Sequence, residues 1–489
     1  MDMEARMKAY TNYIDRSGME HKGYQYDGVK WCLNNELRED PPCGVRGGFI
    51  ADEMGLGKTI LMIGTFVAHM VSNTLIVLPP VLIDQWVLQI QRTTGHKPFV
   101  YHGVNKKGVT CDHLIKHPIV ITTYGAVTLS KSQFENNELT PLHQVKWGRI
   151  VFDEAHHLRN KQTMLFESVK LLNAGIRWLV SGTPIQNKKS DLYSLCSIIG
   201  LPASFYTDSD NLTTLARFFI LKRTKKQVGI QMTDIFINSN IVDWDNQKEM
   251  ELSQEIHADL DFSRVSLAKR GTLGDVLCQN QEKGRVLALM LKAKQTCILP
   301  KLITVSLDKL VQKGVLNNYD SYKEAFDHTS KLDYIVKTIL DRKDNGSGKL
   351  VFCHFRQEID EIAKRLRAAG VENVATFDGR TTHGKRHDIL NDKNDVLILQ
   401  IQTGCEGLNL QENYSEIYFA SPHWNPAVED QAIARCHRIG QTKPVYVHRF
   451  EMCKFIKDPA DLAETMTIDA YATSIQDSKR TIATDCLKV

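Results

Sequence analysis

The chain has 489 residues, of which 42% are hydrophobic and 24% charged, a length that suits two or three domains and a composition typical of a globular protein. Its net charge of +4 permits nucleic-acid binding through local patches, and no apolar run approaches the roughly 18 residues of a membrane span, so we expect no transmembrane segment. The polar N-terminus is unlike a signal peptide, and eleven cysteines without any Cys-x-x-Cys pair predict reduced intracellular thiols rather than disulfides or a zinc site.

Short apolar runs that end in turn residues recur along the first half of the chain. They alternate with segments of helix length, such as residues 82–91 and 163–172. Continuous apolar strands separated by helices predict a parallel sheet covered on both faces. The predicted strands of this half are 48–51, 74–78, 119–122, 150–152 and 178–181.

Strand signals are scarce in the middle of the chain, where helical composition over 247–267 and 282–294 predicts a helical insertion. The strand–helix alternation then returns, with predicted strands at 350–352, 374–377, 396–399, 417–419 and 445–447. The sequence therefore predicts an α/β protein with two lobes. We expect an N-terminal extension over 1–20, a first lobe over 21–225, a helical insertion and linker over 226–330, a second lobe over 331–455, and a polar, partly helical tail over 456–489.

A glycine-rich turn follows the first predicted strand, with the sequence Asp52-Glu53-Met54-Gly55-Leu56-Gly57-Lys58-Thr59. Gly55 and Gly57 allow backbone N–H groups to approach phosphates at the start of a helix. Lys58 would reach the β- and γ-phosphates, and Thr59 would give its hydroxyl to Mg²⁺. The strict phosphate-loop pattern has glycine where Asp52 stands, so the turn by itself could also be a plain strand-to-helix loop.

An acidic motif, Asp153-Glu154-Ala155-His156, follows the predicted strand 150–152 directly. Asp153 at the strand's carboxyl end can hold Mg²⁺, and Glu154 can polarise a water molecule for in-line attack. By itself the motif could be a solvated helix N-terminus, where acidic residues are favoured. Because it follows a Gly-Lys-Thr turn in the same lobe, we expect the two motifs to hydrolyse a nucleoside triphosphate together.

Two arginines near the end of the second lobe, Arg435 and Arg438, are spaced i and i+3, so we expect both on one helical face. An isolated pair of this kind would be two exposed arginines on a helix. Arginines directed at a γ-phosphate instead act as arginine fingers that stabilise the charge of the transition state.

The motifs, in this order, resemble those of the SWI/SNF-type ATPases of helicase superfamily two, which remodel chromatin and translocate on duplex DNA. The most discriminating stretch is Ser181-Gly182-Thr183-Pro184-Ile185-Gln186-Asn187, because RNA helicases of the superfamily carry a Ser-Ala-Thr type sequence there. The resemblance covers about 21–450, and its further segments are His21–Trp31, Leu78–Trp86, Tyr101–Gly103, Thr122–Tyr124, Leu221–Lys225, Lys349–Phe355, Phe377–Gly379, Gly407–Leu410 and His423–Pro426.

The resemblance implies two RecA-like lobes with ATP and Mg²⁺ in the cleft between them, and duplex DNA held through its backbone. It gives catalytic roles to Lys58, Asp153, Glu154, Arg435 and Arg438, and metal ligation to Thr59 and Asp153. Nucleotide contacts are expected from Gln25, which would touch adenine, and from Asp52, Gly55, Gly57, Lys58, Thr59 and Gly407. Thr183 is also a candidate for coupling hydrolysis to movement. The DNA-contact candidates are Gln85, Trp86, Thr122, Thr123, Tyr124, Thr183, Phe355, Arg356, Thr403 and Trp424.

The sequence also departs from the family pattern. Small residues usually precede the Gly407 position, but here the preceding residues are Thr403, Gly404, Cys405 and Glu406. The negative charge of Glu406 predicts less efficient translocation. No zinc-binding cysteine pairs are present, so no ubiquitin-ligase activity is expected.

We expect a DNA-dependent ATPase that displaces nucleosomes, RNA polymerase or other DNA-bound proteins, as a monomer or recruited by partners. Its expected place is the nucleus, or a viral factory or virion, because so short a chain resembles versions encoded by large DNA viruses. The alternatives are a strand-separating helicase, which the Gly-Thr-Pro-Ile-Gln-Asn form opposes, and an ATP-binding scaffold with a decayed motor, which the intact motifs oppose.

Overall fold

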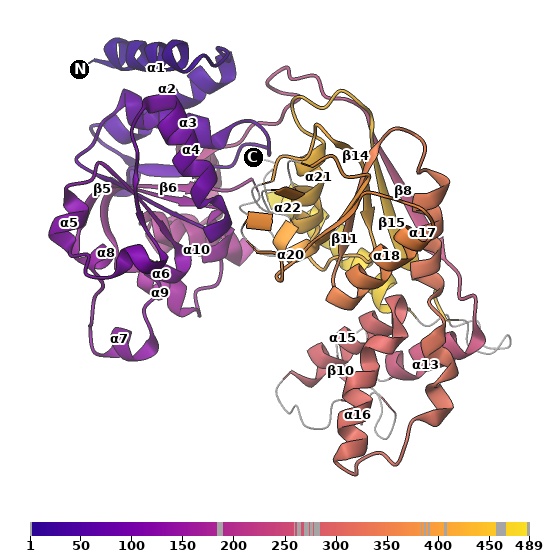
Figure 1. Ribbon diagram of the computed structural model, residues 1–489. Coiled ribbons are helices and arrows are strands. Elements are labelled where there is room, and N and C mark those ends of the chain that lie inside the picture. The colour runs from indigo at the N-terminus through magenta and orange to yellow at the C-terminus, as the bar shows by residue number, and fades with distance from the viewer. Residues whose placement is uncertain are drawn as a thin grey trace. The chain divides into compact units, whose positions relative to one another are not determined.

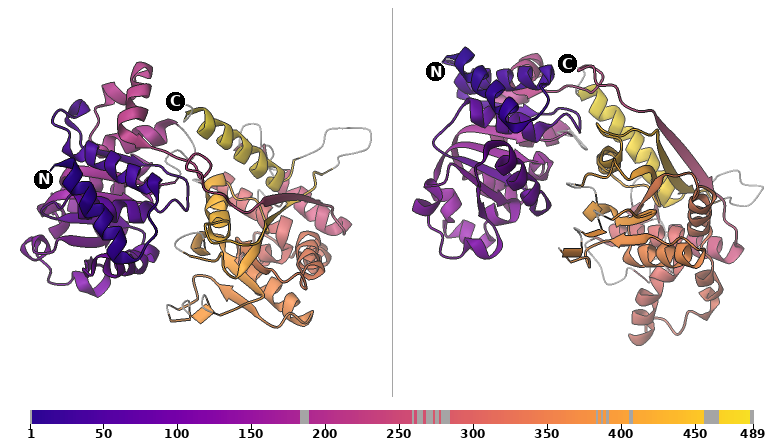
Figure 2. Two further views of the ribbon diagram at one scale, coloured as in Figure 1. Left: turned by 90° about the horizontal axis from the view of Figure 1, so that it is seen from above. Right: turned by 45° about the horizontal axis from the view of Figure 1, so that its top comes forward.

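The computed structural model describes residues 2–182, 189–258, 260–261, 266–267, 273, 277, 284–382, 384–385, 388–389, 392–404, 408–455 and 466–486. Internal contacts divide the chain into two units (Figure 1; Figure 2). The first consists of Met1–Gln231 with Thr481–Val489, and the second of Met232–Arg480.

A seven-stranded parallel sheet with the order β3-β4-β2-β5-β6-β1-β7 forms the centre of the first unit (Figure 1). Alternate residues of β2 enter two different hydrophobic clusters, Leu75 and Val77 one and Ile76 and Leu78 the other. Helices therefore cover both faces, which explains why these strands are apolar throughout. The strands are β1 Gly47–Ile50, β2 Thr74–Leu78, β3 Phe99–Tyr101, β4 Ile119–Thr123, β5 Lys146–Asp153, β6 Asn173–Val180 and β7 Ile220–Leu221.

The helices of the first unit include one at the N-terminus that was expected to be an extension. Asp2 caps it by accepting a hydrogen bond from the backbone N–H of Ala5, and Gly18 ends it in the left-handed conformation. Its residues Met7, Tyr10 and Ile14 are buried in the same cluster as residues of α2 and α3, so it belongs to this core. The helices are α1 Met3–Ser17, α2 Gly23–Leu37, α3 Lys58–Ala68, α4 Ile83–Thr94, α5 Cys111–Ile115, α6 Tyr124–Val127, α7 Lys131–Glu135, α8 Pro141–Gln144, α9 Met164–Lys170, α10 Lys189–Ile199, α11 Ala203–Tyr206 and α12 Leu212–Phe219.

The second unit has a six-stranded parallel sheet with the order β12-β13-β11-β14-β15-β8. The predicted strands of both halves all coincide with observed ones, and the predicted α/β class with two parallel sheets is confirmed. The segment predicted as a helical insertion and linker, 226–330, also contains a strand that the sequence did not predict, β8, which pairs with β15. The strands are β8 Ile235–Val242, β11 Gly348–Cys353, β12 Val374–Phe377, β13 Val396–Gln400, β14 Tyr414–Phe419 and β15 Val445–Met452, with the separate antiparallel pair β9 Leu260–Asp261 and β10 Ser266–Leu267.

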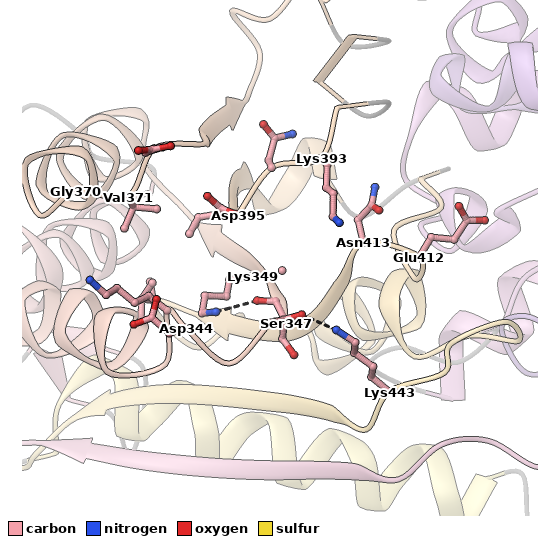
Figure 3. A pocket seen from close by; sticks show the side chains of 17 residues that line it. Asp344, Ser347, Lys349, Gly370, Val371, Lys393, Asp395, Glu412, Asn413 and Lys443 are labelled. Carbon is pink, nitrogen blue, oxygen red and sulfur yellow. Dashed lines mark hydrogen bonds between the residues drawn. The ribbon is translucent and has the colours of Figure 1, made fainter.

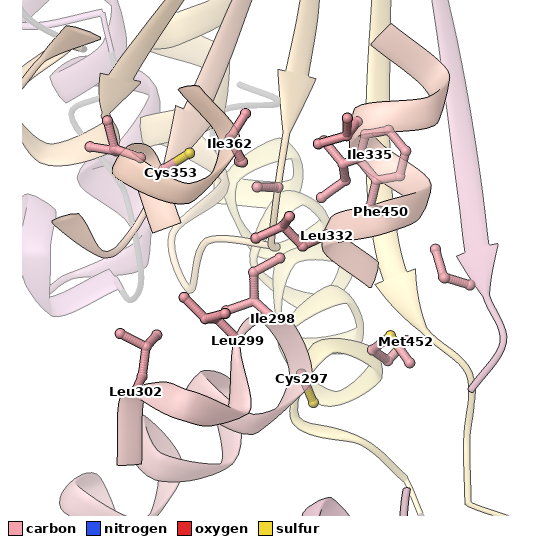
Figure 4. Packing of buried hydrophobic residues seen from close by; sticks show 14 of the residues in the cluster. Cys297, Ile298, Leu299, Leu302, Leu332, Ile335, Cys353, Ile362, Phe450 and Met452 are labelled. Carbon is pink, nitrogen blue, oxygen red and sulfur yellow. The ribbon is translucent and has the colours of Figure 1, made fainter. Parts of the chain in front are cut away.

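The helices of the middle segment share their hydrophobic core with the second sheet. Figure 4 shows Cys297 and Ile298 of α15 in the same cluster as Leu332 and Ile335 of α17 and Phe450 of β15. The segment is therefore packed onto the sheet by apolar burial rather than attached as an independent linker. The helices are α13 Gln247–His257, α15 Arg285–Ile298, α16 Thr304–Gln312, α17 Ser330–Asp341, α18 Arg356–Ala368, α20 Ile401–Gly404, α21 Pro426–Cys436 and α22 Ile468–Cys486.

Helix α22 provides the helix expected in the tail. Near its start, Asp469 forms a fully buried ion pair with Lys331 of α17, with 2.5 Å between Oδ2 and Nζ. The backbone N–H of Ile468 donates to Nε2 of His257 at 3.0 Å. The beginning of α22 is thus attached to the second unit by polar contacts as well as by apolar packing. Among the helices of the described residues, none is both long enough and apolar enough to cross a membrane.

Candidate functional site

The two chemical motifs of the first unit lie at the carboxyl edge of its sheet. The glycine-rich turn follows β1, and Asp153 ends β5. Strand β6 lies between these two strands and is followed by Ser181 and Gly182. Ligands of open α/β sheets bind outside the carboxyl ends of the strands, so the order of the strands brings the predicted site together.

The glycine-rich turn leads directly into α3, of which Lys58 is the first residue. Gly55 and Gly57 have φ values of 94° and 79°, which favour glycine. Among the described residues no side chain caps the start of α3, and a helix start of this kind suits an anion. The Nζ of Lys58 donates to the backbone carbonyl of Asp52 at 3.0 Å, and a Cβ at Gly182 would lie 3.4 Å from this Nζ.

Gln25 on α2 is brought against the same turn. Its side chain is buried, and Nε2 donates to the carbonyl of Leu56 at 3.2 Å. A Cβ at Gly57 would lie 2.5 Å from this Nε2, so any larger residue at 57 would displace Gln25. The predicted adenine contact and the predicted phosphate turn are therefore neighbours, although they are far apart in the sequence.

Asp52 was expected to contact the nucleotide, but its side chain has another partner. The carboxylate is 1% exposed and accepts two hydrogen bonds from Arg223, at 3.0 Å from Nε to Oδ1 and 2.5 Å from Nη2 to Oδ2. Both carboxylate oxygens thus face Arg223 below the surface, away from a position where a bound ligand would lie. We therefore assign Asp52 a supporting role in the turn, in place of the expected nucleotide contact.

Asp153 is held from three sides. Oδ2 accepts from the indole Nε1 of Trp86 at 2.7 Å, and Oδ1 accepts from the backbone N–H of Glu154 at 2.9 Å. The hydroxyl of Tyr124 donates to the carbonyl of Asp153 at 2.7 Å. Burial, together with the neighbouring Glu154 carboxylate, raises the pKa of Asp153 to about 7, against the opposing effects of the Trp86 and backbone hydrogen bonds and of Lys58. A divalent cation at this carboxylate would favour its charged form.

Glu154 has a backbone conformation that is rare for its residue type. Its φ and ψ of 50° and 49° are left-handed, a region that costs a non-glycine residue about 1–3 kcal/mol. Its Oε2 lies 3.3 Å from Nδ1 of His156, and the 3₁₀ turn Ala155–Leu158 follows. Backbone strain of this kind is concentrated at functional sites, which agrees with the role that the sequence predicts for Glu154.

Most DNA-contact candidates of the first unit are interior side chains. Trp86 is 1% exposed, Thr122 donates to the carbonyl of Tyr101 at 2.9 Å, and Thr123 pairs with His102 at 3.3 Å. With the buried Tyr124, these side chains have no surface to offer a DNA phosphate, so we withdraw them as contacts. Gln85 is half-buried, and its Oε1 is buried without a hydrogen-bond partner among the described residues. Thr183 lies outside the described residues.

The two arginines of the second unit do not share a helical face. Arg435 belongs to the last turn of α21, which ends at Cys436, and Arg438 follows after the cap residue His437. The expected placement of both guanidiniums on one helical face is therefore wrong. Arg438 donates to Oδ1 of Asn409. Burial lowers the pKa of Arg438, and the Arg435 guanidinium adds to this effect.

The remaining second-unit candidates follow strands at the carboxyl edge of its sheet. Phe355 caps α18 just after β11, and the exposed Arg356 begins that helix. Trp424 follows β14 and is half-buried, with its ring centroid 6.1 Å from that of Tyr471 and 5.8 Å from Nζ of Lys294. Thr403 lies in the short helix α20, and Gly407 lies outside the described residues.

A cavity of about 600 Å³ lies at the opposite, amino-terminal edge of the second sheet (Figure 3). The segments that line it precede β11, β12, β13, β14 and β15. Four lysines and four acidic residues line it, so it has no net charge of either sign that would select a nucleotide. The charged lining residues are Lys343, Lys349, Lys393, Lys443, Asp344, Glu372, Asp395 and Glu412.

Two protein families match the chain. Residues 24–210 match the SNF2-related domain, and residues 330–440 match the helicase conserved C-terminal domain. The first match contains Gln25, Lys58 and Asp153, and the second contains Arg435 and Arg438.

Several known proteins are similar to most of the chain. The ATP-dependent DNA helicase DDM1 of Arabidopsis thaliana is 26% identical over 90% of this chain and 60% of its own length. The ISWI chromatin-remodeling complex ATPase ISW1 of Saccharomyces cerevisiae is 26% identical over 87% of this chain and 38% of its own length. The DNA excision repair protein ERCC-6-like of Homo sapiens is 26% identical over 85% and 38%. The chain thus spans 38–60% of the length of these relatives. Among solved structures, a Sulfolobus solfataricus SWI2/SNF2 ATPase core in complex with dsDNA matches with 24% identity, a TM-score of 0.39 and 88% of each chain covered.

Proposed function

We propose that this chain is a helicase-like ATPase of the SWI2/SNF2 type, which hydrolyses ATP to translocate on double-stranded DNA and to displace or remodel DNA-bound proteins; its two domain matches support the proposal. The observation that carries the proposal is the convergence of the Lys58 turn and the Asp153-Glu154 pair at one sheet edge. Relatives whose names refer to DNA helicase and chromatin-remodeling activity support DNA as the partner.

The residues of the first unit fit ATP and Mg²⁺. The start of α3, the left-handed glycines and the Lys58 ammonium suit a chain of phosphates. Thr59, the second residue of α3, offers a hydroxyl and Asp153 a carboxylate, and oxygen donors of these kinds are what Mg²⁺ prefers. Gln25, held against the turn, is in reach to read the base beside the phosphates.

The chemistry follows from how these side chains are held. Lys58 would exchange its 3.0 Å contact with the Asp52 carbonyl for phosphate oxygens. Asp153 would present an oxygen to the cation while Trp86 and the Glu154 N–H fix its orientation. When bound, Mg²⁺ neutralises charge on the phosphates. Glu154 would accept a hydrogen bond from the attacking water and direct it in line.

The arginines of the second unit keep the roles that the family resemblance implies. Arg435 and Arg438 would stabilise transition-state charge. The exposed Arg356 is the DNA-backbone contact that its position favours most, with Phe355, Trp424, Thr403 and Gln85 as further candidates. Nucleosomes or a transcribing polymerase in the nucleus are the cargo that such a motor would act on.

The decisive experiment measures steady-state ATP hydrolysis by the purified chain, alone and with duplex DNA, single-stranded DNA or RNA, with Lys58→Ala as the blank. Strong stimulation by duplex DNA is expected. Stimulation by single strands only, together with strand displacement, would support the alternative of a strand-separating helicase. ATP binding without hydrolysis under every condition would support the ATP-binding scaffold and overturn the proposal.

A further inference from the structure

The segment that leaves the first unit runs beside the phosphate turn. Strand β7 pairs with β1, and the ladder continues past the end of both strands. The backbone N–H of Ala51 donates to the carbonyl of Leu221 at 2.7 Å, and the N–H of Glu53 donates to the carbonyl of Arg223 at 2.9 Å. The first part of the turn is therefore hydrogen-bonded to the exit segment, which we define as Leu221–Lys225.

Arg223 adds side-chain contacts to this ladder. Besides its two hydrogen bonds to the Asp52 carboxylate, its Nη1 donates to the carbonyl of Tyr24, and its guanidinium lies 5.7 Å from the Tyr24 ring centroid. The side chain is 16% exposed. A Cβ at Gly28 would lie 2.8 Å from Nη2, so this glycine on α2 makes room for the guanidinium.

Both partners of Arg223 are directly connected to the predicted nucleotide contacts. The carbonyl of Asp52 accepts from Nζ of Lys58, and Tyr24 precedes Gln25 in the chain. One guanidinium thus fixes the start of the phosphate turn relative to the helix that carries the predicted adenine contact. Its planar, forked donors suit a task that a lysine ammonium could perform only in part.

Lys225 makes a second connection between the exit segment and the turn. Its backbone N–H donates to Oε2 of Glu53 at 2.8 Å, and its Nζ lies 3.4 Å from Oε1 of the same residue. The side chain of Lys225 is buried, whereas that of Glu53 is 42% exposed. This pair is weaker than that of Arg223, because one partner is partly solvated.

We propose that Arg223 is a positioning residue of the ATP site, which holds the phosphate turn and the Gln25 segment in register with the exit segment. The inference rests on the proposed function for the identity of the ligand. It goes further by giving a residue outside the phosphate-binding motifs control over nucleotide affinity. The competing explanation is that Arg223–Asp52 is only a stabilising ion pair.

The test compares Arg223→Gln, Asp52→Asn and the double variant by titration with a fluorescent ADP analogue, at a temperature where melting curves show every variant to be folded. We expect Arg223→Gln to weaken binding at least tenfold, because it leaves a buried carboxylate without its counter-charge. The double variant removes both charges, so its loss of affinity should be smaller than the product of the two single effects.

Two further variants separate positioning from stability. Arg223→Lys keeps the positive charge but loses the planar, forked donors of the guanidinium. We expect its affinity for the ADP analogue to lie between those of the wild type and Arg223→Gln. Arg342→Gln breaks a comparable pair with Glu416 in the second unit and should lower the melting temperature without changing the affinity. The inference is overturned if Arg223→Gln binds like the wild type or if Arg342→Gln loses as much affinity. It is also overturned if the fold losses of Arg223→Gln and Asp52→Asn simply multiply in the double variant. A wild-type chain that binds no adenine nucleotide would instead overturn the proposed function.

Discussion

The support of Asp153 by Trp86 leads to a prediction that separates catalysis from stability. Trp86→Phe keeps an aromatic ring in the core but removes the indole N–H that donates to Oδ2 at 2.7 Å. Asp153 is buried, so this oxygen would lose a neutral donor that also orients it. We expect the variant to fold and to bind nucleotide, but to need more Mg²⁺ and to turn over more slowly.

The size of the effect follows from the kind of hydrogen bond that is lost. A hydrogen bond to a charged group contributes about 1.5–3 kcal/mol. At 1.36 kcal/mol for each factor of ten, its full expression in the orientation of the metal-binding carboxylate would raise the Mg²⁺ requirement between about tenfold and about 150-fold. Relaxation of the site reduces this figure, so we expect a shift near the lower end.

The assay is DNA-stimulated ATP hydrolysis as a function of Mg²⁺ concentration, together with a melting curve for each variant. Trp178→Phe is a matched control, because Trp178 is equally buried in the same unit and its Nε1 donates at 2.7 Å to a carboxylate, that of Glu36, which is not a predicted metal ligand. The control should lose stability without a change in Mg²⁺ requirement. An unchanged Mg²⁺ requirement in Trp86→Phe, or an equal shift in both variants, would refute the reasoning.

Three other substitutions test separate parts of the molecule. Glu154→Gln should bind ATP normally in a filter-binding assay but hydrolyse it orders of magnitude more slowly, and near-normal turnover would remove Glu154 from the mechanism. Arg438→Ala should lower kcat while leaving nucleotide affinity largely intact, and an unchanged kcat would contradict the arginine-finger role. Burial lowers the pKa of His257 to about 4, against its usual 6.5, so the folded state excludes the proton that the unfolded state takes up. The free energy of unfolding that this exclusion contributes above pH 6.5 is therefore lost as the pH falls toward 4, by about 2 kcal/mol between pH 7 and 5. In urea unfolding, the His257→Gln variant should lack this part of the pH-dependent loss.

The strands that the sequence did not predict show what its hydrophobic pattern encodes. The missed strands of the two parallel sheets, β3, β7 and β8, all lie at the ends of those sheets. An edge strand has one neighbour and can be partly exposed, as β8 is at Phe236 and Ile237, and in β8 the polar residues 238–240 interrupt the apolar run. The central strands could be predicted because consecutive residues in them are apolar and buried.

The same distinction applies to the candidate site. The glycines, Lys58 and Asp153 could be predicted because their chemistry depends on neighbours within the same short motif. Trp86 and Asp153 are 67 residues apart, and Arg223 and Asp52 are 171 apart, so no local pattern indicates that either pair meets. Assignment of whole segments to the DNA track also placed Trp86 and Tyr124 on a surface, whereas the fold turns both side chains toward Asp153.

A motif identifies a stretch of chain at the edge of a sheet, but it does not say which side chain faces outward. At the carboxyl edge of the first sheet, the turn after β1 and the end of β5 carry the residues that can contact a ligand. Residues from α4, α6 and the exit segment hold these residues from behind. A substitution of a supporting residue should therefore change affinity or metal requirement without removing a reacting group. Trp86 and Arg223 are the two positions at which this difference can be measured.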